Sequence, residues 1–220
     1  MSQFGLAILL LAAFTSEARR TFPIEEHSVE PAEHEPVAQG TTSVALILSP
    51  DQKFATFQKK FSSSKHVSNG LYYAKADNGK SKVKSFFVVY TADNYATGDT
   101  GTAYLVPQNP LSGSTEVVQS KDPIKSFQGF IVENPGIVVF QHFDYKGNGV
   151  QFQERANSID EYFDYDQRDG VSSYIVTGGK WILCLEENLQ GECIFANQGD
   201  LIPATVHNDR IRSLAPVKRF

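Results

Sequence analysis

Two cysteines are the residues whose spacing points most directly to chemistry. Cys184 and Cys193 stand in the segment WILCLEENLQGECIF, which has the composition of a strand, a turn and a return strand. They are symmetric about the centre of that turn, between Asn188 and Leu189, so in a regular hairpin they would face each other within disulfide reach. We therefore predict a bond between them. The alternative is a pair of small apolar core residues.

Carboxylate and imidazole side chains form two further groups that could hold cations. Residues 160–169 carry five acidic side chains, which could gather divalent cations or meet a mineral or basic partner. A charge run of this kind also suits a solvated loop. His27 and His34 lie beside glutamates and could chelate a transition metal, with solvated polar residues as the alternative.

Motifs for catalysis are missing from the sequence. It contains no Gly-x-Ser-x-Gly elbow, no His-Glu-x-x-His pair and no phosphate-binding loop, and neither His142 nor His207 has a second histidine at metal spacing. A serine triad could still assemble from residues distant in the chain. We expect a protein that is not an enzyme.

The elements that must position these residues are set by a fourfold repeat. Each copy has a β-branched apolar residue, a polar residue, Ser and a large apolar residue, which alternates like a half-buried strand. The serines, Ser85, Ser126, Ser173 and Ser213, are 41, 47 and 40 residues apart, which predicts one supersecondary unit per repeat. The copies are 83–86 (VKSF), 124–127 (IKSF), 171–174 (VSSY) and 211–214 (IRSL).

Strand character dominates each repeat. Aromatic residues make up 12% of the chain, and every repeat opens with a β-rich run that breaks at a polar turn and resumes. No window keeps apolar residues at helical spacing for a dozen positions, and Gly, Pro, Asn and Asp recur every eight to twelve residues. This rhythm predicts an all-β sandwich.

A spaced aromatic pattern recurs at the start of the repeats. Phe140, Tyr145 and Gly147 form an aromatic, four residues, a second aromatic, one residue and Gly. Repeat two places its Gly98 one position late, repeat four keeps the spacing without rings, and repeat one has Lys53-Phe54-Ala55 in place of the Gly. The pattern resembles the βγ-crystallin family, whose signature residues here are Phe140, Tyr145, Gly147, Ser173, Trp181, Gly191 and Ser213.

This resemblance implies an all-β chain of two βγ-crystallin-like Greek-key β-sandwich domains. Residues 43–132 would form a divergent first domain and residues 133–220 the second, with the turn-forming tetrapeptide 133–136 (ENPG) as a short connector. The resemblance is stronger in the second half of the chain.

The same resemblance implies a calcium loop before each serine phrase. In this sequence the fifth position of that loop is Arg212 in repeat four and lysine in the first domain, and these side chains supply no oxygen. At most one weak calcium site is expected, at Asp169, Ser172, Asn208 and Asp209. The alternative is that these residues cap and close turns.

The N-terminus has the features of a targeting segment. An apolar run at 6–14 and the small residues of Ser16-Glu17-Ala18 predict a signal peptide at 1–18, and residues 19–42 read as a flexible acidic extension or pro-segment. No other stretch is long and apolar enough for a membrane span. We expect a secreted, extracellular protein without a transmembrane segment.

Charge is divided unevenly along the chain. Residues 43–132 carry net +4 and residues 133–220 net −5, which favours docking of the two domains, although scattered surface charge fits as well. The acidic balance and the expected export both oppose phosphate binding, so we expect no nucleic-acid partner. An extracellular protein, glycan or mineral surface remains as partner, and we expect a monomer with paired domains.

The function expected from these features is a non-catalytic structural or interaction protein of an extracellular matrix or secretion. One alternative is a calcium-binding module with a single weak site. Another is a secreted defence factor, either a protease inhibitor or a toxin partner, with the loop at 108–116 (QNPLSGSTE) as the inhibitory element.

Overall fold

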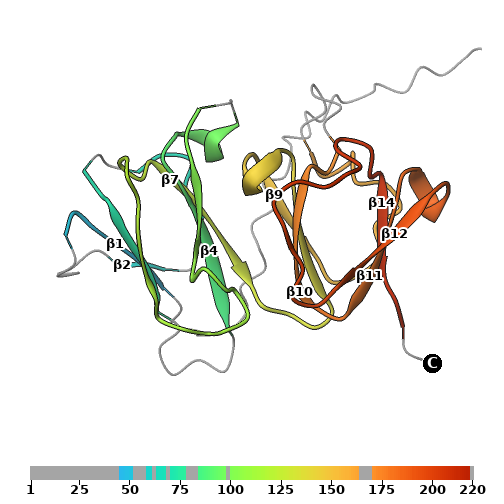
Figure 1. The fold of residues 1–220 in the computed structure, drawn as a ribbon, viewed down its shortest axis with the longest axis horizontal. Coiled ribbons are helices and arrows are strands. Elements are labelled where there is room, and N and C mark those ends of the chain that lie inside the picture. The colour runs from blue at the N-terminus through green and yellow to red at the C-terminus, as the bar shows by residue number, and fades with distance from the viewer. Residues whose placement is uncertain are drawn as a thin grey trace, which may run out of the picture. The chain divides into compact units, whose positions relative to one another are not determined.

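The computed structural model contains strands and short 3₁₀ turns, with no α-helix among the residues that it describes (Figure 1). The signal peptide and extension predicted at 1–42 lie outside the described residues. The described ranges are 45–51, 58–60, 63–67, 70–77, 84–97, 100–163 and 170–218.

Fourteen strands are found in this part of the chain. The first seven form the first sandwich and the last seven form the second sandwich. In chain order they are β1 (Ala45–Ser49), β2 (Gln58–Lys60), β3 (Tyr73–Asp77), β4 (Ser85–Tyr90), β5 (Ala103–Val106), β6 (Val117–Gln119), β7 (Ser126–Ile131), β8 (Gly136–Phe140), β9 (Gly149–Phe152), β10 (Ser173–Gly178), β11 (Lys180–Cys184), β12 (Cys193–Asn197), β13 (Leu201–Ile202) and β14 (Ser213–Pro216).

The first sandwich packs the sheet β2-β1-β3-β6 against the sheet β5-β4-β7. Alternate residues of facing strands build its core, because side chains of a strand point to opposite faces. Leu46 and Leu48 of β1 belong to the same buried cluster as Phe87 and Val89 of β4.

The second sandwich packs the sheet β13-β10-β8-β9 against the sheet β12-β11-β14. Its core includes Trp181, which is fully buried and donates its indole N–H to the carbonyl of Gly178 at 3.0 Å. The buried indole therefore has its hydrogen-bond partner, as a tryptophan inside a core requires.

Neighbouring repeats exchange strands. β6 belongs to the second repeat but lies in the sheet of the first, and β13 of the fourth repeat lies in the sheet of the third. Isolated bridges between Ser64 and Phe127, and between Ala156 and Leu214, join the repeats in the opposite direction. The prediction of an all-β Greek-key fold is therefore confirmed.

The serine of the repeat phrase has one place in the fold in three repeats. Ser126, Ser173 and Ser213 each open the closing strand of a repeat and lie directly opposite the last residue of its first strand. Their partners are Tyr90, Phe140 and Cys184.

The prediction that Ser85 is the fourth such serine is wrong. Ser85 opens β4, the first strand of the second repeat, and pairs with Ile131. The corresponding position of the first repeat is Tyr73, which opens β3 opposite Ser49. The four-residue phrase gave the wrong assignment because its alternation fits the start of any half-buried strand. It does not distinguish the first strand of a repeat from the closing strand.

A third apolar cluster lies between the two sandwiches. We call it the interface core. It contains residues on the outer face of the β5-β4-β7 sheet together with residues on the outer face of the β13-β10-β8-β9 sheet. Its members are Phe86, Val88, Tyr90, Tyr95, Ala96, Phe130, Val138, Phe140 and Ile175.

Candidate functional site

Three repeats fold their opening ribbon into the same hairpin. Each hairpin contains at least two consecutive residues with positive φ, a conformation that residues other than glycine rarely adopt. These are Asn94 and Tyr95 in repeat two, followed there by Ala96, Asp144 and Tyr145 in repeat three, and Asn188 and Leu189 in repeat four. Such strained pairs persist only where surrounding contacts hold them.

A serine hydroxyl fixes each of these hairpins. Ser173 Oγ accepts the N–H of Tyr145 at 3.0 Å and donates to the carbonyl of His142 at 2.6 Å. Ser126 makes the same two bonds in repeat two, with Tyr95 and Ala92. Each hydroxyl satisfies two backbone groups that the hairpin would otherwise leave unpaired.

The third repeat has the complete aromatic hairpin. The Tyr145 and Phe140 rings meet edge to face, with centroids 5.6 Å apart. Gly147 has φ +76°, and a Cβ there would come within 2.8 Å of His142 Cδ2. Glycine is therefore required both by conformation and by space.

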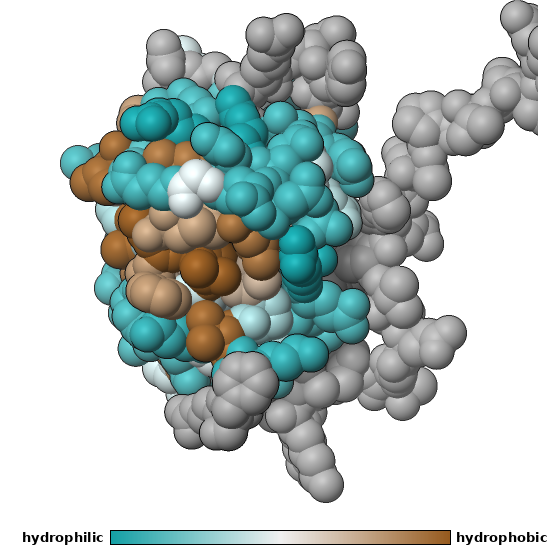
Figure 2. Space-filling view, turned by 90° about the vertical axis from the view of Figure 1, so that its right-hand side faces the viewer, coloured by the Kyte–Doolittle hydropathy of each residue, from teal (hydrophilic) through white to brown (hydrophobic). Residues whose placement is uncertain are grey.

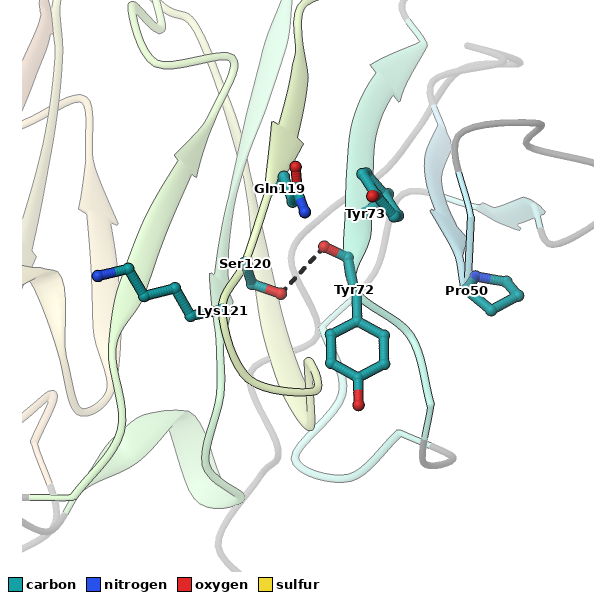
Figure 3. A pocket seen from close by; sticks show the side chains of 6 residues that line it. All are labelled: Pro50, Tyr72, Tyr73, Gln119, Ser120 and Lys121. Carbon is teal, nitrogen blue, oxygen red and sulfur yellow. Dashed lines mark hydrogen bonds between the residues drawn. The ribbon is translucent and has the colours of Figure 1, made fainter.

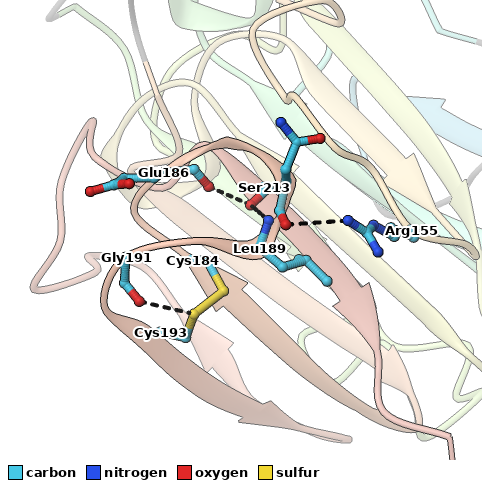
Figure 4. Close-up of a disulfide and its surroundings, with 8 residues drawn as sticks. Arg155, Cys184, Glu186, Leu189, Gly191, Cys193 and Ser213 are labelled. Carbon is cyan, nitrogen blue, oxygen red and sulfur yellow. Dashed lines mark hydrogen bonds between the residues drawn. A yellow bond between two sulfur atoms is a disulfide. The ribbon is translucent and has the colours of Figure 1, made fainter.

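The fourth repeat replaces the ring pair with a disulfide (Figure 4). Cys184 and Cys193 lie directly opposite each other in β11 and β12 and are bonded. Ser213 Oγ accepts the N–H of Leu189 at 2.9 Å and donates to the carbonyl of Glu186. The covalent link and the serine together close a hairpin that has no aromatic ring to cover it.

Part of the predicted calcium site is brought together. Ser172 Oγ lies 2.6 Å from the carbonyl oxygen of Gln141 and 2.7 Å from Asp209 Oδ1. Asn208 is adjacent, and its buried Oδ1 has no hydrogen-bond partner. Asp169, the fourth predicted ligand, lies outside the described residues.

The chemical types of these oxygen atoms are suitable for binding calcium. Hydroxyl, carboxylate, carbonyl and amide oxygens are the ligands that calcium prefers, but it needs six to eight of them. Among the described atoms only Asp209 contributes a negative charge. A site here would therefore be weak.

The corresponding position of repeat four does not fit a cation. Arg212 is the counterpart of Ser172, because its N–H bonds the carbonyl of Cys184 as that of Ser172 bonds Phe140. The Arg212 guanidinium donates to Asp160 Oδ1 at 3.3 Å. A positive charge occupies the place where a ligand oxygen would be needed.

The acidic run at 160–169 is only partly described. Asp160 pairs with Arg212, and the Tyr162 ring packs edge to face on Phe152 at 4.9 Å. Residues 164–169 lie outside the described residues, as do His27 and His34. In the described part of the chain no group of three or more His, Cys, Asp or Glu side chains could hold a metal ion.

The first sandwich has an open pocket of about 490 Å³ near the start of β3 (Figure 3). Ser120 Oγ donates to the carbonyl of Tyr72 at 3.0 Å across it. Tyr72 is the first-repeat counterpart of Ser172, so a phenol replaces the short hydroxyl of the second sandwich. The lining residues are Pro50, Tyr72, Tyr73, Gln119, Ser120 and Lys121.

Polar side chains seal the interface core. Gln128 Nε2 donates to the Gly147 carbonyl at 2.9 Å and to the Tyr90 hydroxyl at 2.6 Å, and Gln128 Oε1 accepts from Gly149 at 2.8 Å. The Tyr90 hydroxyl donates in turn to the carbonyl of Tyr145 at 2.9 Å. Every one of these buried groups is paired, which makes the contact specific as well as apolar.

Burial shifts the acidity of the interface tyrosines. It raises the pKa of Tyr145 to about 12, with a smaller contribution from the Asp144 carboxylate. It also raises the pKa of Tyr90 well above its usual value, although the Gln128 hydrogen bond acts in the opposite direction. Both phenols therefore stay neutral at physiological pH.

The sequence reasoning did not predict these interface residues. The available signal was the unbroken apolar run of β4, which is typical of a strand buried on both faces. One face of β4 enters the first core, and Phe86, Val88 and Tyr90 enter the interface core.

The loop proposed as an inhibitory element joins β5 to β6. Asn109 Oδ1 accepts the N–H of Leu111 at 3.0 Å, and Ser112 Oγ donates to the Asn109 carbonyl at 2.8 Å. Lys84 Nζ donates to the carbonyl of Leu111 at 3.2 Å. These bonds order the loop, and they do not favour inhibition over a connecting role.

Comparison with known proteins identifies part of the chain. Residues 136–217 match the Beta/Gamma crystallin family model. No curated protein sequence matches the chain. Within the described residues, no helix is both long and apolar enough to span a membrane.

Several solved structures are similar to this chain at low sequence identity, and the first of them shares its fold. Geodin, a beta-gamma crystallin from Geodia cydonium, matches with a TM-score of 0.57 and 17% identity over 81% of this chain and all of its own. A beta gamma crystallin from Ciona intestinalis covers 37% of this chain and 99% of its own, at 20% identity and a TM-score of 0.33. Protein S, solved in complex with calcium, covers 80% of this chain and 99% of its own, at 13% identity and a TM-score of 0.32.

Proposed function

Because this chain belongs to the βγ-crystallin family through the domain formed by residues 136–217, we propose that it is a secreted, non-catalytic structural protein of an extracellular matrix or secretion. We divide it into domains at 43–132 and 133–220, preceded by a signal peptide and an acidic extension. Fold alone does not set function, so the proposal depends on particular contacts.

The observation that carries the proposal is the interface core with its polar seal. Because residues of both sandwiches are buried in this contact, the two sandwiches form one packed unit rather than two independent domains joined by a linker. Gln128 and Tyr90 add directional bonds that an apolar contact lacks. A rigid unit of this kind suits a load-bearing or space-filling role.

The disulfide supports an extracellular setting. Bonds such as that between Cys184 and Cys193 persist in oxidising compartments and are rare in the cytosol. The predicted signal peptide agrees with this, since it would direct the chain to such a compartment.

The test has a cellular and a physical part. Full-length chain expressed in animal cells should be recovered from the medium with its N-terminus beginning near residue 19, and retention inside the cells would contradict the proposal. In urea, Trp181 fluorescence reports only the second sandwich, whereas far-ultraviolet circular dichroism reports both. The two curves should coincide; separated transitions would show that the sandwiches do not act as one unit.

Weak calcium binding is a second candidate, favoured by the convergence of Ser172, Asp209 and the Gln141 carbonyl beside the unpartnered oxygen of Asn208. Asp169 would complete the set. Calcium bound there would hold the loops of repeats three and four together and stabilise the second sandwich.

Melting curves with and without millimolar calcium test this candidate. We expect calcium to raise the melting temperature of the parent chain and to leave that of Asp209→Asn unchanged. Asp144→Asn is the matched control, because Asn tolerates the positive φ at that position and the site is separate. An unchanged melt of the parent at millimolar calcium would remove the candidate.

A further inference from the structure

The outer face of the β12-β11-β14 sheet carries exposed apolar side chains, and Lys180 Nζ lies 4.1 Å from the centroid of the Phe195 ring. Ile182 lies directly between Phe195 and Ala215 across the three strands. Phe195 is 57% exposed and Val217 is 39% exposed. Figure 2 looks onto the side of the molecule where these strands lie and shows apolar side chains gathered there.

This face is the counterpart of a face that is buried in the first sandwich. Cys184 opposite Ser213 corresponds to Tyr90 opposite Ser126, which aligns β11 with β4, β12 with β5 and β14 with β7. In this alignment Ile182 matches Val88, Phe195 matches Leu105 and Val217 matches Phe130. The three first-sandwich residues lie in or against the interface core.

The contact in the interface core joins unlike faces. A sheet centred on an even-numbered repeat, β5-β4-β7, meets a sheet centred on an odd-numbered repeat, β13-β10-β8-β9. The part of the chain that the structure describes has one more sheet of each kind, β12-β11-β14 and β2-β1-β3-β6. These two are the surfaces that the interface core leaves unused.

The β2-β1-β3-β6 sheet of the first sandwich corresponds to the β13-β10-β8-β9 sheet of the second. Ile47, Lys75 and Val117 form one row across β1, β3 and β6, and Val117 is 41% exposed. The corresponding residues of the second sandwich lie in or against the interface core. They are Val138, Ile175 and Leu201, in the same order.

Charge favours a contact between these two faces over a contact of like with like. The segment 43–132 has ten lysines against six acidic residues, whereas 133–220 has eight basic residues against thirteen acidic ones. Pairing two β12-β11-β14 faces would bring two acidic sandwiches together. Pairing β12-β11-β14 with β2-β1-β3-β6 brings opposite net charges together.

We propose that a second copy of this chain docks head to tail, placing its β2-β1-β3-β6 face on the β12-β11-β14 face of the first. Each added copy leaves one free face of each kind, so assembly continues as an open chain. The inference adds a partner to the scaffold role and replaces the monomer expected from the sequence, and it is argued from the sheet faces and the charges of the two segments rather than from the proposed function. Its failure would leave the scaffold proposal in place.

Complementary variants test the geometry. Phe195→Asp disables one face and Val117→Asp the other, and each is expected to weaken association of the purified full chain about thirtyfold or more. An equimolar mixture should form a 1:1 dimer and nothing larger, because one intact pair of faces remains. Val206→Asp, at a side chain 89% exposed outside both faces, should assemble as the parent does.

Sedimentation velocity from micromolar to millimolar protein, at low and high salt, gives the readout, with circular dichroism to verify folding. The parent should grow with concentration and shrink with salt. Val217→Asp replaces Phe195→Asp if that variant unfolds. A parent that stays monomeric, a mixture that stays monomeric, or dimers of Val117→Asp alone would overturn the proposal.

Discussion

Gln128 and Gln151 reach across the interface core in opposite directions, each pairing its side-chain amide with the backbone of the other sandwich. Gln128 bonds Gly147 and Gly149, and Gln151 bonds both the N–H and the carbonyl of Ile131. Gln128 is buried, whereas Gln151 is only partly so. The reciprocal bonds fix the relative register of the two sandwiches, which apolar contacts alone would allow to slide.

Gln128→Ala should lower the free energy of unfolding by about 1–3 kcal/mol, because it leaves the buried carbonyl of Gly147 and the partly buried N–H of Gly149 without partners. Gln151→Ala should cost less, since water can reach the groups that it exposes. Urea unfolding followed by fluorescence measures both. Equal effects of the two substitutions would show that burial of the amide does not set the cost.

Raising the pH should weaken the fold through the interface tyrosines. In the unfolded chain a tyrosine ionises near pH 10.0, whereas the pKa of Tyr145 is about 12 in the fold. The folded form therefore holds the proton more tightly, so this contribution is full below pH 10 and is lost as the pH rises towards 12.

Tyr90 shares this behaviour, because burial also raises its pKa. Urea unfolding at several pH values should show a smaller alkaline loss for Tyr90→Phe than for the parent. Tyr162→Phe, at an exposed side chain, serves as the control. An identical alkaline slope in Tyr90→Phe and the parent would contradict the assignment.

Local patterns were enough to predict the fold, and contacts between distant residues were not. The aromatic hairpin of Phe140, Tyr145 and Gly147 could be predicted because all of its parts lie within eight residues. Tyr73 could not be recognised as a counterpart of the serines, since a phenol leaves no trace of the hydroxyl pattern. The interface core was missed because an apolar run such as β4 does not say what covers each of its faces.

The candidate calcium site was predictable only in outline. Ser172 and Asp209 were named from their positions before the strands, and the fold brings their oxygens together. The contribution of the Gln141 carbonyl had no signal in the sequence, because every residue has a backbone carbonyl and only the folded hairpin aims this one at Ser172.

Ser173→Ala should lower the free energy of unfolding by about 1–3 kcal/mol. The substitution leaves the Tyr145 N–H and the His142 carbonyl unpaired in a hairpin that already holds two residues at positive φ. Thermal or urea unfolding measures the loss. Ser112→Ala, which removes a hydroxyl from an exposed loop, should change stability by less than about 0.5 kcal/mol; equal losses would contradict a special role for the repeat serine.

The disulfide should stabilise the second sandwich by about 2–3 kcal/mol, because it closes a short loop of the unfolded chain, with a sequence separation of 9 between Cys184 and Cys193. Replacing both cysteines with alanine should lower the urea midpoint by the corresponding amount and leave the hairpin bonded through Ser213. Reducing the parent with dithiothreitol should bring its stability close to that of the double variant, because alanine and a reduced cysteine both leave the loop open. If reduction left the parent as stable as before while the double variant lost stability, packing of the buried Cys184 side chain rather than the covalent link would be responsible.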